Sequence, residues 1–180
     1  MHRATRARRR GLTCDAKAFT LVEVLLAILV MGTGLVASMR ALAVILKASE
    51  ASRNALVAQQ LAVGLLVEIA LLPYEDPVSP TFGPEGGEVT GTRSQFDDID
   101  DYDGWTASPP QKKDGTAEPG ASGYTRSVLV VNVDMQDLTK VVADGSSDAK
   151  SVTVTVTRPG MTPVSLTAVR LKGANREDAY

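Results

Sequence analysis

Cysteine and histidine are almost absent from this chain. Its 180 residues include one of each, Cys14 and His2, and both precede a long apolar run. A disulfide within the chain needs two cysteines, so none can form. Residues 15–180 therefore offer no candidates for a triad that uses histidine or for a zinc site of histidine and cysteine. The sequence also lacks a Cys-x-x-Cys pair and a glycine-rich phosphate loop, and we expect a protein that is not an enzyme.

Charge is scarce between residues 21 and 46, where Glu23 and Arg40 are the only charged side chains and proline is absent. About 20 predominantly apolar residues are enough to cross the hydrocarbon core of a bilayer. The run is therefore predicted to form a membrane-spanning helix. A cleaved secretory signal fits less well, because its apolar region has only about 7–15 residues. The end of the run, Ala37-Ser38-Met39-Arg40, is also a poor cleavage site for such a signal.

Basic residues gather ahead of the apolar run. Residues 1–18 contain six basic side chains and one acidic side chain, a net charge of +5, whereas residues 19–180 contain 13 basic and 20 acidic side chains, a net charge of −7. Positive residues that flank a span stay in the cytoplasm, so the N-terminus is predicted to be cytoplasmic. We interpret the basic residues as a topogenic leader rather than a nucleic-acid-binding arm. The acidic remainder argues against binding nucleic acid, because phosphate contacts use Lys and Arg.

Glu23 lies three residues into the apolar run, where a lone carboxylate is unfavourable. An acidic residue at the centre of a span costs roughly 2.5–3.5 kcal/mol, and less near an end. Anchoring a protein does not require that cost, so Glu23 predicts a partner of opposite charge. The alternative is a plain signal anchor whose Glu23 lies near the lipid headgroups.

The basic leader, Lys17-Ala18, Phe19-Thr20-Leu21-Val22-Glu23 and the apolar run together resemble the N-terminal motif of prepilins. That family comprises type IV pilins and the pseudopilins of type II secretion, and the resemblance says little about the rest of the chain. It implies that a membrane-embedded prepilin peptidase cuts between Ala18 and Phe19 and methylates the new amino group of Phe19. Ala18 departs from the glycine that is usual before the cut, so slower cutting is expected.

The resemblance also implies a role for Glu23 in subunit assembly. An α-amino group has a pKa of about 7.7–8.0, so the amine of Phe19 would be largely cationic and could pair with Glu23 of a neighbouring subunit. The implied function is that of a minor pilin or pseudopilin, which primes or caps a type IV pilus or a type II secretion pseudopilus.

The implied location is the inner (cytoplasmic) membrane, crossed once, with the C-terminal domain periplasmic or extracellular, or a surface filament. The implied partners are the membrane itself, the prepilin peptidase, other pilin or pseudopilin subunits, the assembly platform protein and its ATPase. A function of another class is also open: a membrane-anchored periplasmic or extracellular binding module with an acidic loop.

The helix is predicted to continue beyond the membrane as an amphipathic segment over residues 47–72. The segment is rich in good helix formers, and Pro73 ends it. Four apolar side chains recur at helical spacings and predict the face that packs on the exported domain: Leu56, Val63, Val67 and Leu71.

Residues 73–123 are rich in Pro, Gly, Asp and Ser and predict an irregular connection, where functional surface often lies. Ca²⁺ takes 6–8 oxygen ligands, and five carboxylates of this stretch are the candidates for a Ca²⁺ site: Asp97, Asp98, Asp100, Asp101 and Asp103. Their spacing does not match an EF-hand, and a solvated acidic turn without metal is the alternative. No other cofactor is expected. Three aromatic side chains are predicted to hold the stretch on the core: Phe96, Tyr102 and Trp105.

Three later segments alternate apolar and polar residues and predict strands over residues 124–134, 151–158 and 164–171. Short turns between consecutive strands favour an antiparallel sheet. The predicted fold class is α+β: a long N-terminal helix, with a transmembrane half and an amphipathic half, packed on a small antiparallel β-sheet. This is the fold that the pilin resemblance implies. The predicted organisation is a cleaved leader (1–18), a transmembrane or filament-core helix (19–46), its amphipathic continuation (47–72), an irregular connection (73–123) and a sheet region (124–180).

Overall fold

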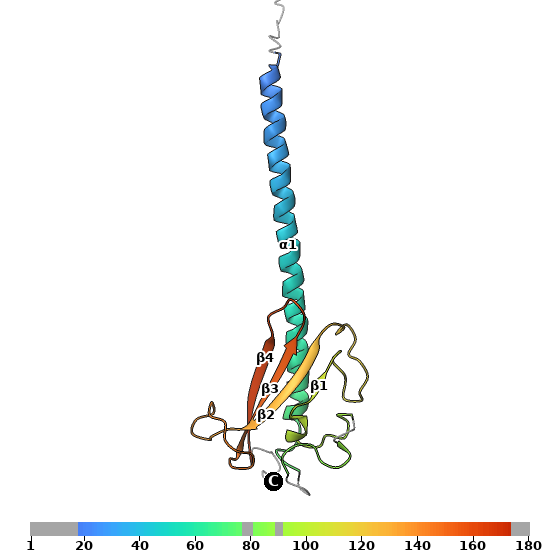
Figure 1. Ribbon diagram of the computed structural model, residues 1–180, viewed down its shortest axis with the longest axis vertical. Coiled ribbons are helices and arrows are strands. Elements are labelled where there is room, and N and C mark those ends of the chain that lie inside the picture. The colour runs from blue at the N-terminus through green and yellow to red at the C-terminus, as the bar shows by residue number, and fades with distance from the viewer. Residues whose placement is uncertain (1–17, 77–80, 89–91, 174–180) are drawn as a thin grey trace, which may run out of the picture. The chain divides into compact units, whose positions relative to one another are not determined.

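The computed structural model describes residues 18–76, 81–88 and 92–173. One long helix, α1 (Leu21–Ala70), comes first, and a 3₁₀ turn, η2 (Asp100–Tyr102), follows in the connection. The strands are β1 (Thr106–Ala107), β2 (Thr125–Asn132), β3 (Ala149–Thr157) and β4 (Val164–Leu171) (Figure 1). The chain divides into two compact units, residues 1–47 and residues 48–180, which we describe separately.

The first unit contains the N-terminal part of α1, and its described side chains are exposed. Thr20 directly precedes the helix, and its Oγ1 accepts a hydrogen bond of 3.3 Å from the backbone N–H of Glu23. This side-chain cap satisfies one of the N–H groups that a helix start leaves without a partner. Among the described residues, α1 is the one helix that is long and apolar enough to cross a membrane.

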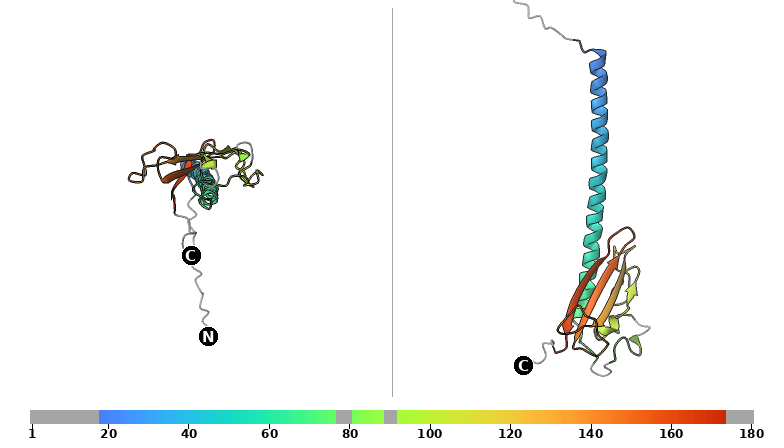
Figure 2. Two further views of the ribbon diagram at one scale, coloured as in Figure 1. Left: turned by 90° about the horizontal axis from the view of Figure 1, so that it is seen from below. Right: turned by 60° about the vertical axis from the view of Figure 1, so that its left-hand side comes forward.

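The second unit contains a four-stranded antiparallel sheet in the order β1-β2-β3-β4. Consecutive strands are neighbours, although only the connection between β3 and β4, residues 158–163, is short. The C-terminal part of α1 covers one face of this sheet (Figure 2). The predicted α+β fold class is thus confirmed. The short edge strand β1 is an addition, because it lies in the stretch that was expected to be irregular.

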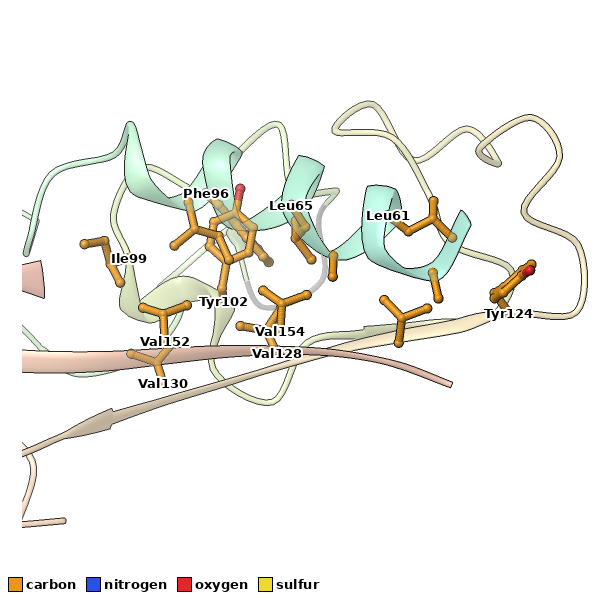
Figure 3. Close-up of a cluster of buried hydrophobic side chains, with 14 of the residues drawn as sticks. Leu61, Leu65, Phe96, Ile99, Tyr102, Tyr124, Val128, Val130, Val152 and Val154 are labelled. Atoms are coloured by element: carbon orange, nitrogen blue, oxygen red, sulfur yellow. The ribbon is translucent and has the colours of Figure 1, made fainter. Parts of the chain in front are cut away.

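The core lies between the helix and the sheet. Period-two alternation buries Val128 and Val130 of β2, and it does the same for Val152, Val154 and Val156 of β3. Figure 3 shows Leu61 and Leu65 of α1 pointing toward these valines. The helix buries five side chains in this interface: Ala58, Leu61, Ala62, Leu65 and Ile69. Two of these are alanines, whose small side chains let the helix backbone approach the sheet.

The predicted packing face of the helix is wrong. All four of its side chains are exposed: Leu56, Val63, Val67 and Leu71. At 3.6 residues per turn, Leu56, Val63 and Val67 lie on the side of the helix opposite the buried five, and Leu71 directly follows the end of α1. Residues 55–72 are apolar on most sides of the helix, so helical spacing alone identified a real stripe without showing which stripe meets the sheet.

Leu65 and Leu56 provide a matched test of this assignment. Leu65→Ala should lower the free energy of unfolding by about 2–5 kcal/mol, because it leaves a cavity in the core. Leu56→Ala should change it by no more than about 0.5 kcal/mol, because Leu56 is exposed. The measurement is denaturant unfolding of the full chain in detergent micelles, followed by the fluorescence of Trp105, the only tryptophan. Equal losses for the two variants would contradict the orientation of the helix.

Candidate functional site

The predicted cleavage point lies just ahead of α1. Ala18 and Phe19 are in non-helical backbone, and the helix begins two residues later, at Leu21. The side chain of Phe19 is 77% exposed. The Ala18–Phe19 bond is therefore exposed and lies outside the helix. The rest of the predicted leader, residues 1–17, lies outside the described residues.

Glu23 is exposed in the first turn of α1. A carboxylate in this position interacts favourably with the helix dipole, by typically 0.3–1 kcal/mol at exposed sites. Thr20-Leu21-Val22-Glu23 is also the Thr-x-x-Glu pattern of a capping box, and Thr20 makes its half of that arrangement. Glu23 thus has a local structural role at the helix start, which the sequence analysis missed. Its carboxylate is still available to a second copy of the chain.

The predicted acidic loop is built around η2. Asp98 Oδ1 accepts hydrogen bonds from the backbone N–H groups of Asp100 (2.8 Å) and Asp101 (3.3 Å). In return, Asp101 Oδ2 accepts hydrogen bonds from the backbone N–H groups of Asp97 (2.8 Å) and Asp98 (3.1 Å). Two nearly fully buried carboxylates therefore hold the turn by bonding its backbone reciprocally.

Asp100 forms a buried ion pair that joins the connection to the sheet. Its Oδ1 accepts a hydrogen bond from Lys150 Nζ of β3, and its Oδ2 accepts one of 3.2 Å from the N–H of Gly83. Lys150 also donates to the backbone oxygen of Tyr74 at 2.7 Å and lies 4.3 Å from the centre of the Tyr74 ring. The side chains of Asp100 and Lys150 are 3% and 6% exposed. Each charge is therefore compensated inside the protein.

The remaining two aspartates lie apart from this arrangement. Asp103 Oδ1 accepts a hydrogen bond of 2.9 Å from the N–H of Val130 in β2, and Asp97 is exposed. Among the described residues, the one group of three carboxylates with ligand atoms within 4.8 Å of one another is Glu85, Glu88 and Asp101. Of the five predicted metal ligands, only Asp101 belongs to it. A Ca²⁺ site formed by all five stays a prediction.

Burial raises the pKa values of two carboxyl groups in this loop, and neighbouring carboxylates raise them further. The pKa of Asp98 is raised to about 8 by burial first and then by the charges of Asp100 and Asp101. The pKa of Asp101 is also raised, first by burial and further by the nearby charge of Glu88. Both groups therefore hold a proton more tightly than an exposed aspartate does.

Aromatic side chains hold the connection on the core, as predicted. Phe96 and Tyr102 are buried with their rings edge to face, the centroids 4.9 Å apart. Tyr102 Oη donates a hydrogen bond of 2.8 Å to Glu68 Oε1 of α1, and Arg93 forms an ion pair with the same oxygen. Trp105 is half-buried, with the Arg93 guanidinium 4.5 Å from its ring centre. No sequence pattern indicated that Glu68 and Arg93 would meet, because 24 residues separate them.

Glu85 and Glu88 were also missed. They lie outside the aspartate run, and no short sequence motif connects Glu85-Gly86-Gly87-Glu88 with Asp101. The signal was the pair of glycines, which allows a tight turn between two carboxylates.

No family model, curated protein or solved structure matched this chain. Its function is therefore argued from its own residues.

Lys150 and Lys140 provide a matched test of the buried ion pair. Lys150→Met should lower the free energy of unfolding by about 3–5 kcal/mol, because it leaves the buried carboxylate of Asp100 without its counter-charge. Lys140→Met should have little effect, because the Lys140–Asp134 pair is largely exposed. Denaturant unfolding of the full chain measures both. A similar small loss for the two variants would contradict the role of the Asp100–Lys150 pair.

Proposed function

We propose that this chain is a minor pilin or pseudopilin, a structural subunit that primes or caps assembly of a type IV pilus or a type II secretion pseudopilus. One observation carries the proposal: Glu23 lies in the first turn of an exposed apolar helix, and that helix begins two residues after Phe19. Cutting that bond would create a cationic amine four residues ahead of a carboxylate.

The proposed assembly step is a charge pairing between copies. The amine of Phe19 in one subunit meets Glu23 of a neighbour inside an apolar bundle of helices. Opposite charges attract more strongly there than in water, because the dielectric constant is low. Removing one partner from such a pair costs roughly 3–5 kcal/mol, since the other charge is left buried. The pair therefore selects one register between subunits and excludes the others.

The exposed stripe of α1 supports contact between helices of neighbouring copies. Leu56, Val63 and Val67 lie opposite the face that packs on the sheet, so the domain's own core does not use them. Contiguous exposed apolar surface of this kind is typical of interaction sites. In the proposed filament, this stripe continues the helix–helix contact beyond the membrane-spanning segment.

The proposed topology places the leader in the cytoplasm and residues 48–180 on the far side of the inner membrane. This orientation follows from the basic leader. The proposed partners are the prepilin peptidase, other pilin or pseudopilin subunits, the platform protein and the assembly ATPase.

The intact mass of the membrane-extracted protein tests processing. We expect a chain that has lost residues 1–18 and gained one methyl group on the amine of Phe19. Recovery of a chain that still begins at Met1 would contradict the proposal, because the amine would not exist. A processed chain that never enters a filament would favour the anchored binding module instead.

Substitution of Glu23 tests the charge pairing separately from the helix cap. Glu23→Gln keeps a side chain suited to the capping box but removes the charge. We expect normal membrane insertion and a reduction in filament incorporation on the order of a hundredfold or more, the equivalent of the loss of a buried pair. The measurement is the amount of subunit in a sheared or overexpressed filament fraction relative to the membrane fraction.

Thr20→Ala is the matched control, because it removes the hydrogen bond to the Glu23 N–H and keeps the carboxylate. We expect this variant to be incorporated nearly as well as the wild type. Normal incorporation of Glu23→Gln, or equal losses for both variants, would show that Glu23 acts only at the helix start.

A further inference from the structure

A group of three carboxylates lies beside η2, away from the N-terminal motif. Glu85 and Glu88 belong to one tight turn, in which the N–H of Glu88 donates to the backbone oxygen of Glu85 at 2.9 Å. Glu88 Oε2 accepts a hydrogen bond of 3.0 Å from the N–H of Glu85. Gly86, at φ 50°, supplies the left-handed backbone of this turn. Asp101 of η2 completes the group, and one oxygen from each residue lies within 4.8 Å of the others.

Two of these side chains carry buried oxygens without a hydrogen-bond partner. Asp101 is 1% exposed, and its Oδ1 has no partner although its Oδ2 accepts two backbone N–H groups. Glu85 Oε1 is likewise buried without a partner. A buried charged oxygen left unsatisfied is strongly destabilising. These atoms therefore indicate a missing positive group.

The protein does not supply that group from the part of the chain that the structure describes. The ion pairs there join Arg93 to Glu68, Lys140 to Asp134, Lys150 to Asp100 and Lys172 to Glu75. None of them includes a carboxylate of the turn or Asp101.

We propose that Glu85, Glu88 and Asp101 bind one Ca²⁺ ion. All the ligand atoms are carboxylate oxygens, which hard divalent cations prefer. Two oxygens on opposite sides of one Ca²⁺ ion are about 5 Å apart, twice the ligand distance, so ligand atoms within 4.8 Å of one another suit that ion. Mg²⁺ is smaller and demands near-ideal octahedral geometry, so it fits a partly exposed turn less well.

The bound ion would add a second link between two segments that the hydrogen bond from the Gly83 N–H to Asp100 already joins. Glu85 and Glu88 precede η2 in the chain, and Asp101 in turn holds the backbone of Asp97 and Asp98. Ca²⁺ would thus fix the connection between α1 and the sheet. This inference does not depend on the proposed function, because none of its residues belongs to the N-terminal motif.

Calorimetric titration of Ca²⁺ into the chelator-treated full chain in detergent tests the proposal, together with thermal unfolding followed by Trp105 fluorescence. We expect binding, a dissociation constant of about 10⁻⁴–10⁻³ M as in extracellular modules, and a higher melting temperature with Ca²⁺ than with chelator. Glu85→Gln and Glu88→Gln should each weaken binding at least tenfold. These two side chains are half-buried, so the variants should still fold.

Two controls separate this site from other carboxylates. Glu75→Gln removes an exposed carboxylate that pairs with Lys172, and Asp97→Asn removes an exposed member of the aspartate run. Both should bind Ca²⁺ as the wild type does. The proposal is overturned if the wild type binds no Ca²⁺, if binding survives in both glutamate variants, or if Mg²⁺ raises the melting temperature as much as Ca²⁺ does.

Discussion

The buried ion pair between Asp100 and Lys150 is the contact on which the second unit, residues 48–180, depends. It joins the long connection after α1 to the middle of the sheet, with the Tyr74 carbonyl and the Gly83 N–H as further partners. Because both charges are almost fully buried, the pair is favourable only when the surrounding groups are in place. It therefore fixes where η2 lies on the sheet, and with it the positions of Asp98, Asp101 and Asp103.

The part of α1 in the second unit has two apolar stripes, one buried and one exposed. One stripe, with two alanines, contacts the sheet, and the opposite stripe carries larger side chains that remain exposed. The second stripe adds nothing to the core of the domain. Its exposure is explained if helices of other copies cover it, as in the proposed filament. A similar division holds at the start of the helix. Thr20 caps the helix by accepting a hydrogen bond from the Glu23 N–H, whereas the carboxylate of Glu23 is exposed. The proposed function thus uses the surface that the core leaves unused.

The sequence was sufficient for the fold class and the main strands. Residues 151–157 alternate with one buried face, and the apolar centre of β2, residues 128–131, indicated a strand inside the sheet. It was not sufficient for the orientation of the helix, because a segment that is apolar on most sides does not show which side faces the sheet. The acidic loop shows a second limit. Five aspartates within seven positions suggested either a cation site or an acidic turn without metal. In the structure, Asp98, Asp100 and Asp103 bind backbone groups and Lys150. Glu85 and Glu88 reach Asp101 only through the fold, which no local pattern reveals.

Asp103 covers part of a free strand edge of the sheet. The partner of β2 on its outer side, β1, has only two residues, so most of that edge would present bare amide groups. The carboxylate of Asp103 accepts a hydrogen bond from the N–H of Val130, and the backbone oxygen of Trp105 accepts one from the N–H of Val128. Free strand edges recruit strands from other molecules and lead to aggregation. The aspartate-rich turn thus hinders another strand from pairing with this edge of β2.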